Sequence, residues 1–129
     1  MQEKWTKESA IKLFLYFYNQ NKDLFFIAYD EDKPVGIITS VLKPWWDGYH
    51  LEDGELFVIP EYRHQGIAKL LFKALFKCAV DKYNVTVLEA HTYEDENGFP
   101  YNWYKRIGFE TVNDLKIISG NIKEIMKKL

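Results

Sequence analysis

The chain has 129 residues, of which 47% are hydrophobic and 17% are aromatic. These fractions exclude a disordered tail and suffice for one core, so residues 1–129 are predicted to form a single domain. The 17 basic and 19 acidic residues give a net charge of −2 without any basic run, which argues against binding of nucleic acid.

The start of the chain has no signal-peptide pattern, and no apolar stretch approaches the roughly 20 residues that span a bilayer. The single cysteine, Cys78, allows no internal disulfide and suits a reducing compartment. We therefore expect a cytoplasmic protein with no membrane partner. Because Cys78 falls on the apolar side of a predicted helix, we expect it to be a core residue.

The first elements in chain order are a helix and a hairpin. Residues 6–19 have the apolar spacing of a helix, and Thr6 is suited to cap it. Residues 25–29 and 35–42 are β-type runs joined by a short polar segment that contains a proline. This pattern predicts two antiparallel strands.

The middle of the chain predicts a loop, a strand and a long helix. Residues 43–48 contain proline and glycine and are predicted to be a loop. Residues 52–59 are predicted to be a third strand, which Pro60 ends because proline lacks the N–H of a ladder. Residues 66–82 have apolar side chains at helical spacing and lysines on the opposite side, which predicts an amphipathic helix.

The remaining elements are shorter. Residues 85–90 are predicted to be a fourth strand, and residues 100–106 a short helix. Residues 109–112 and 115–118 predict a final β pair, and residues 121–129 a short basic helix. This order of strands and helices predicts an α/β (α+β) fold with a mixed sheet and helices on its faces.

The segment from Pro60 to Ala68 has the sequence Pro-Glu-Tyr-Arg-His-Gln-Gly-Ile-Ala and joins a strand to a helix. An Arg-x-x-Gly-x-Ala turn can present backbone N–H groups to an anion, and Gly66 has no side chain that would block a phosphate. The helix dipole adds roughly half a positive charge there. A nucleotide is a further candidate ligand, but the Gly-Lys-Ser/Thr and Gly-x-Gly-x-x-Gly patterns of nucleotide loops are absent.

A second motif, residues 97–109, has the sequence Asn-Gly-Phe-Pro-Tyr-Asn-Trp-Tyr-Lys-Arg-Ile-Gly-Phe. Together with the turn, its order Asn…Tyr…Gly-Phe resembles the GCN5-related N-acetyltransferase (GNAT) superfamily over about residues 24–118. The resemblance implies a mostly antiparallel sheet flanked by helices, with acetyl-CoA as donor, an amine as acceptor and no metal. The family usually has one more strand before its first helices, and we expect that strand to be missing or displaced here.

By this resemblance, backbone amides of the turn bind the diphosphate of CoA, and the strand edge before the turn pairs with the pantetheine arm. The residues implied in cofactor binding are Leu56, Phe57, Val58, Arg63, His64, Gln65, Gly66, Ile67, Ala68, Asn97 and Tyr104. Lys69 or Lys73 either reaches the outer phosphates or belongs to a solvated helix face. Asn97 corresponds to the family asparagine that contacts CoA, and it is also a candidate helix cap.

Tyr104 lies four residues before Gly108, where the family has its general acid. A free thiol has a pKa of about 8.5 and tyrosine one of about 10, so a phenol can protonate a leaving thiolate without being ionised at neutral pH. The alternatives are that Tyr104 is an ordinary packing aromatic, or that Tyr101, one helical turn earlier, has this role.

Deprotonation of the amine requires a base, since a primary amine with a pKa near 10.4 needs about 4–5 kcal/mol to become neutral at pH 7. The candidates are Glu52, Glu55 and Glu89, with His50 behind them, and a route without a base is a further alternative. By resemblance Glu52 has the usual acidic position, and Glu89 has the position used in some branches. A regular strand directs Glu52 and Glu55 to opposite faces unless a bulge at Gly54 intervenes.

An acidic cluster near the predicted cleft favours a cationic acceptor, although acidic loops are common. Its members are Asp47, Glu52, Asp53, Glu55, Glu94, Asp95 and Glu96. Trp45 and Trp46 are candidates for a cation–π wall or for a contact within a homodimer. The acceptor is a small polyamine, an aminoglycoside-like amine, a lysine or a peptide N-terminus, and the sequence does not choose among them.

The second hypothesis is a catalytically inactive acyl-CoA-binding protein that acts as a sensor or a partner subunit. The expected absence of the first strand, which a partner chain could replace, favours this hypothesis. The presence of Tyr104 argues against it, so N-acetyl transfer is the leading prediction.

Overall fold

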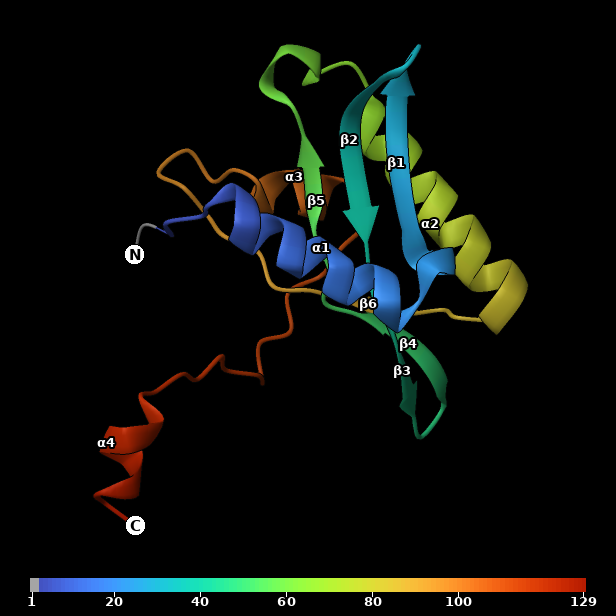
Figure 1. Ribbon diagram of the computed structural model, residues 1–129. Coiled ribbons are helices and arrows are strands. Elements are labelled where there is room, and N and C mark those ends of the chain that lie inside the picture. The colour runs from blue at the N-terminus through green and yellow to red at the C-terminus, as the bar shows by residue number, and fades with distance from the viewer. Residues whose placement is uncertain (1–2) are drawn as a thin grey trace. The chain divides into compact units, whose positions relative to one another are not determined.

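The computed structural model describes residues 3–129 (Figure 1). The chain forms two compact units, which are described separately: the first ends at His91, and the second comprises Thr92–Leu129. Helices combine with largely antiparallel strands, which confirms the predicted fold class. The prediction that residues 1–129 form one domain stays a prediction.

The first unit begins with helix α1 (Lys7–Gln20), close to its predicted bounds. The Thr6 hydroxyl accepts a hydrogen bond from the Ser9 N–H, and the Ser9 hydroxyl accepts one from the Thr6 N–H at 2.9 Å. This reciprocal capping box fixes the helix start. A short 3₁₀ turn, η1 (Lys22–Leu24), follows, and within residues 3–129 no strand precedes α1.

The strands of the first unit form two three-stranded sheets, where the sequence predicted one mixed sheet. Sheet A has the order β1–β2–β5, with antiparallel pairs throughout. Its strands are β1 (Phe25–Asp30), β2 (Lys33–Thr39) and β5 (Leu56–Val58). Sheet B has the order β3–β4–β6, with an antiparallel and then a parallel pair. Its strands are β3 (Val41–Trp45), β4 (Gly48–Glu52) and β6 (Leu88–Glu89).

Residues 43–48, predicted to be a loop, instead contribute to the hairpin of β3 and β4, so that prediction is wrong. The proline in this segment, Pro44, is tolerated because β3 is an edge strand, where a missing N–H need not disrupt a ladder. The predicted strand at residues 85–90 is also shorter than expected, since only β6 is formed.

Two predicted long strands are each interrupted, and the interruptions lie against each other. The strand expected at residues 35–42 breaks at Ser40, and the strand expected at 52–59 breaks at Asp53 and Gly54, with φ of 53° and 126°. A Cβ on Gly54 would lie 1.9 Å from the carbonyl oxygen of Thr39. The Ser40 hydroxyl also donates to the Asp53 carbonyl at 3.1 Å. Close backbone approach at Gly54 therefore separates β4 from β5.

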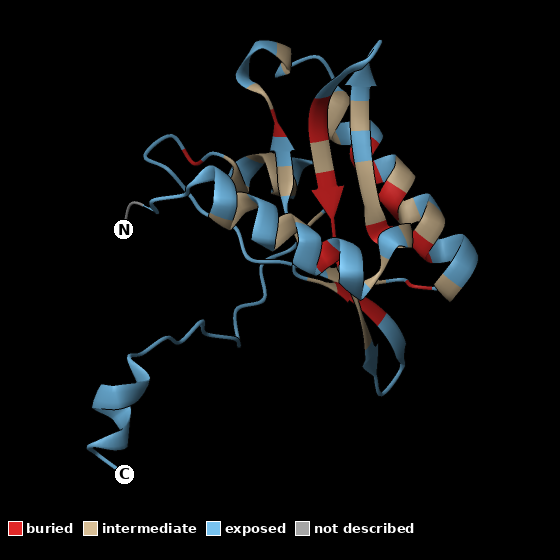
Figure 2. Ribbon diagram, in the orientation of Figure 1, coloured by how far each residue is buried: buried red, intermediate tan, exposed pale blue. Residues whose placement is uncertain are grey.

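Helix α2 (Ile67–Tyr83) packs on one face of sheet A, and α1 crosses the other face (Figure 1). Leu71 and Leu75 of α2 are buried, and a Cβ on Gly36 of β2 would lie 3.2 Å from the Leu71 side chain. Buried positions gather along β2 and α2 in Figure 2. Cys78, expected in the core, is half-buried, and its thiol donates to the Asp23 carbonyl oxygen at 3.1 Å.

The second unit contains helices α3 (Tyr101–Arg106) and α4 (Ile122–Met126). Both predicted helices are present, and the Asn121 side chain accepts from backbone N–H groups at the start of α4. The β pair expected at residues 109–118 is not formed. Its apolar side chains are exposed, as in Ile118 at 89%, so a strand pair would gain no buried face there. No helix in the described part of the chain has the length and apolar character to cross a membrane.

Candidate functional site

The turn between β5 and α2 has two residues with positive φ and leads into a helix start that no side chain caps. After the 3₁₀ turn η2 (Pro60–Tyr62), His64 and Gly66 have φ of 63° and 83°. Gly66 is the N-cap of α2, and a Cβ there would have no atom within 4 Å. The first helical bond runs from Leu70 N–H to Gly66 O, so the preceding N–H groups lack acceptors within the helix. This open helix start can hold a phosphate.

The Arg63 side chain points back to the strand rather than along the helix. Its Nε donates to the Val58 carbonyl oxygen at 2.8 Å, and its guanidinium lies 5.5 Å from the centre of the Phe57 ring. The Gln65 amide similarly donates to the Glu61 carbonyl at 3.3 Å. These two side chains therefore hold the turn against the strand and the 3₁₀ turn before it. Lys69 and Lys73, on the first turns of α2, are exposed.

Strand β5 offers an open edge directly before this turn. Bonds from Thr39 N–H to Glu55 O and from Ile59 N–H to Val35 O, both 2.9 Å, fix which residues of β5 face β2. By alternation, Leu56 and Val58 direct their amides to the other side. Within residues 3–129 no strand pairs with that side. The edge can therefore pair with an extended, amide-bearing ligand.

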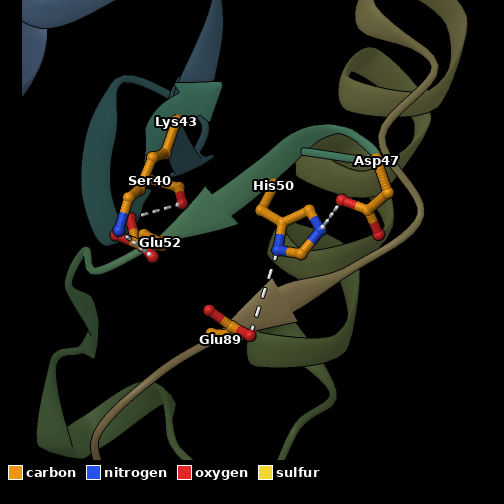
Figure 3. A network of polar contacts seen from close by, with 6 residues as sticks. All are labelled: Ser40, Lys43, Asp47, His50, Glu52 and Glu89. Carbon is orange, nitrogen blue, oxygen red and sulfur yellow. Dashed lines mark hydrogen bonds and ion pairs between the residues drawn. The ribbon is translucent and has the colours of Figure 1, made fainter. Parts of the chain in front are cut away.

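One face of sheet B carries a polar network (Figure 3). Lys43 is the register partner of His50, and Glu52 is the partner of Glu89, so these four side chains share a face. The Lys43 ammonium lies 2.8 Å from Glu52 Oε1 and 4.5 Å from the centre of the Trp45 ring. Glu52 is thus already engaged with a cation of the chain itself.

His50 is the buried centre of this network, with an exposure of 7%. Its Nε2 lies 2.9 Å from Asp47 Oδ1, and its Nδ1 lies 3.9 Å from Glu89 Oε1. Figure 3 shows the imidazole between the two carboxylates, one from the β3–β4 turn and one from β6. Neither these side chains nor any others of residues 3–129 form a group of three or more suited to hold a metal ion.

Glu55 follows the strand interruption. Its backbone N–H donates to the Thr39 hydroxyl at 2.9 Å, which fixes the start of β5. Local burial, followed by repulsion from the carboxylates of Glu3 and Asp53, raises the pKa of the Glu55 carboxyl above its usual value. Such a shift makes a carboxylate a stronger base.

Tyr104 lies on α3 in the second unit. Its ring is half-buried and makes edge contacts with the rings of Trp103 and Phe109, with centroids 5.1 and 5.4 Å away. The competing tyrosine, Tyr101, has its hydroxyl hydrogen-bonded to the Thr111 hydroxyl. Tyr101 is therefore already engaged within its own unit.

Asn97 is exposed and does not cap α3, whose N-cap is Pro100, so that alternative is wrong. The loop is instead ordered by Asp95, whose carboxylate accepts from the N–H groups of Asn97 and Phe99 at 2.9 and 2.8 Å. Asp95, a member of the predicted acidic cluster, therefore stabilises the loop of residues 95–99.

Sequence analysis did not identify the engagement of Glu52 by Lys43 or the position of His50 between two carboxylates. Both depend on the pairing of β3 with β4, and residues 43–48 were expected to be a loop. Polar and aromatic residues two positions apart in both segments, Lys43 and Trp45 and then His50 and Glu52, were the signal that could have revealed this hairpin.

The comparisons with known proteins agree on one fold. The model of the acetyltransferase (GNAT) family matches residues 1–109. The chain is similar to an integron cassette protein from the Vibrio cholerae mobile metagenome, at 25% identity and a TM-score of 0.63, over 79% of this chain and 63% of that one. It therefore spans less than two thirds of that protein. No curated protein matches the sequence.

Two further solved structures share the fold. The aminoglycoside 6'-N-acetyltransferase AAC(6')-IG from Acinetobacter haemolyticus has 16% identity and a TM-score of 0.69, covering 93% of this chain and 85% of that one. Naa50 from Arabidopsis thaliana, in complex with the bisubstrate analogue CoA-Ac-MVNAL, has 18% identity and a TM-score of 0.58, covering 86% and 83%.

Proposed function

The chain belongs to the acetyltransferase (GNAT) family, and from this premise we propose that it transfers the acetyl group of acetyl-CoA to a primary amine. We propose further that it works as one N-acetyltransferase domain in the cytoplasm. The observation that carries the proposal is the open helix start at Gly66, directly after the unpaired edge of β5. A diphosphate and an amide-bearing arm are the two parts of CoA that these features suit.

The donor fits the residues present at the turn. The absence of any atom within 4 Å of a Cβ on Gly66 leaves room for phosphate oxygens next to the amides of the turn and of the first residues of α2. Leu56 and Val58 offer outward-facing backbone groups for the arm, although the Val58 carbonyl already accepts from Arg63. We therefore assign the arm to three backbone groups: the N–H and the carbonyl of Leu56 and the N–H of Val58.

The reaction has a simple balance. The neutral amine attacks the thioester carbon, the C–S bond breaks, and the leaving sulfur takes a proton that Tyr104 donates. The attacking nitrogen loses a proton as the amide forms, and one further proton is lost when the ammonium of the acceptor becomes neutral. Tyr104 is assigned the acid role because it lies four residues before Gly108, the position at which the family has its general acid.

The carboxylates differ in their suitability as bases. Glu52 is held by the Lys43 ammonium, which reduces its availability for an acceptor amine. Glu55 has a raised pKa, and Glu89 is half-exposed with its carboxylate toward His50. We assign the base to Glu89 or Glu55 ahead of Glu52.

We propose that the acceptor is cationic. Lys43 supports this, because the chain's own ammonium rests between a carboxylate and the face of Trp45, an arrangement that suits an alkylammonium. Trp46 in the adjoining turn is 87% exposed. Two structural neighbours are in line with such amines, since one is an aminoglycoside 6'-N-acetyltransferase and the other is in complex with the bisubstrate analogue CoA-Ac-MVNAL.

The test is calorimetric titration of the chain with acetyl-CoA, followed by thiol release with four acceptors: kanamycin, spermidine, an N-terminally blocked lysine peptide, and a peptide whose only amine is its N-terminus. Binding with amine-dependent thiol release is the expected result. Binding without release with any acceptor would favour the inactive acyl-CoA-binding protein. Absence of binding would refute the assignment of the turn.

A further inference from the structure

His50 is an unusual histidine for a small domain, because it is buried between two carboxylates that both reach solvent. Its side chain is 9% exposed, whereas those of Asp47 and Glu89 are 38% and 49% exposed. No other described histidine is buried, since His64 and His91 are both exposed. His50 can therefore exchange protons with a substrate only through a neighbour.

The contacts fix which nitrogen carries the proton. An ionised carboxylate only accepts hydrogen bonds, so at 2.9 Å the Nε2–H of His50 donates to Asp47. In the neutral ring Nδ1 then has a lone pair, and this atom lies 3.9 Å from Glu89 Oε1. This distance between Nδ1 and Oε1 is longer than a hydrogen bond. A shift of the Glu89 side chain by about 1 Å would bring a protonated Glu89 close enough to donate to Nδ1.

We propose that Asp47, His50 and Glu89 form a proton relay that serves the acceptor amine. Glu89 takes a proton from the ammonium: the N–H bond breaks and an O–H bond forms. Glu89 passes that proton to His50 Nδ1, and the resulting imidazolium lies between two carboxylates. After acetyl transfer the imidazolium returns this proton to Glu89, whose side chain is 49% exposed and releases it to solvent, and His50 is again the neutral Nε2–H ring. Glu89 is the catalytic residue, and His50 and Asp47 are positioning residues.

The charges around His50 agree with this direction. Its neighbours on the face of sheet B are Asp47, Glu89, the cross-strand partner Lys43 and Glu52. Lys43 is directed to Glu52 by their 2.8 Å contact, so the two charges nearest the ring are negative. The inference rests on the proposed transferase function, because it names the base of that reaction.

The kinetic test compares His50→Gln with wild type on the best acceptor of the four-amine panel. We expect kcat/KM for the amine to fall tenfold or more at pH 7.5, within the roughly 10²–10⁴-fold that acid–base catalysis supplies, with an unchanged KM for acetyl-CoA. The defect should shrink toward pH 9.5, because the neutral fraction of an amine with a pKa near 10.4 rises about 100-fold over that range. His91→Gln, which alters an exposed histidine close to Glu89, is the matched control and should match wild type.

A purely structural role predicts a different pattern: a defect that is constant with pH and includes a changed KM for acetyl-CoA. That pattern, or full activity of His50→Gln, would overturn the relay. Should His50→Gln fail to fold, Glu89→Gln alters a half-exposed side chain. It should lose activity within the same roughly 10²–10⁴-fold range and recover with pH in the same way. Wild-type activity in Glu89→Gln would equally overturn the proposal.

A second measurement needs no turnover and so separates the relay from the transferase function. Long-range ¹H–¹⁵N correlation of the histidine rings at pH 8.5 reports which nitrogen carries the proton. We expect His50 to be the Nε2–H tautomer in wild type and to shift toward the Nδ1–H tautomer in Asp47→Ala, which leaves Glu89 as the only carboxylate next to the ring. A proton on Nδ1 in the neutral wild-type ring would refute the relay even in an active enzyme.

Discussion

Replacement of Gly54 by alanine tests the contact that separates β4 from β5. Gly54 has φ of 126°, and its added Cβ would lie 1.9 Å from the Thr39 carbonyl oxygen, a backbone atom that cannot turn aside. Strain at positive φ costs about 1–3 kcal/mol. Overpacking adds about 1–3 kcal/mol, so the free energy of unfolding should fall by about 2–6 kcal/mol.

Gly48→Ala is the matched control, because Gly48 has a similar φ of 131° but no atom within 4 Å of an added Cβ. It should show the strain without the clash, a loss of about 1–3 kcal/mol. Urea unfolding followed by circular dichroism measures the free energy of unfolding of both variants. In a thermal melt, each 1 kcal/mol of lost stability should lower Tm by roughly 4 °C. Equal destabilisation of the two variants would refute the claim that the Thr39 carbonyl excludes a side chain at Gly54.

Three further predictions concern the site. Gly66→Glu should abolish binding of acetyl-CoA in calorimetry, because a carboxylate would occupy the space assigned to the diphosphate; tight binding would move the phosphate site elsewhere. Tyr104→Phe should lower kcat by about 10²-fold or more with little change in acetyl-CoA affinity, and an unchanged kcat would remove Tyr104 from the acid role. Glu55→Gln should raise the urea midpoint at pH 7. Because burial and the Glu3 and Asp53 carboxylates raise the pKa of Glu55 in the folded state, the ionised form is penalised as pH rises through that pKa. The gain should disappear below pH 4.5, the usual value for the group, and an equal gain at pH 4 would contradict this cause.

Local signals in the sequence were sufficient for the helices and for the backbone turn at Gly66. The Thr6 capping position, the helical spacing of α2 and Gly66 at its start involve residues a few positions apart, and each was confirmed in the structure. Propensity, capping and periodicity act over such short distances, so one sequence can reveal them. The family motif at the turn and at Tyr104 is of the same local kind.

The strand interruptions and the polar network on sheet B were decided only by tertiary structure. Gly54 was recognised as a candidate bulge, but the Thr39 carbonyl that requires a glycine there belongs to another strand. Likewise, Lys43 meets Glu52, and His50 meets Glu89, only through the registers of β3, β4 and β6. Register depends on packing between segments distant in the chain, and a shift of one residue would turn each of these side chains to the other face. The sequence therefore determined which chemical groups the chain possesses, and the pairing of its strands decided which of them stand together.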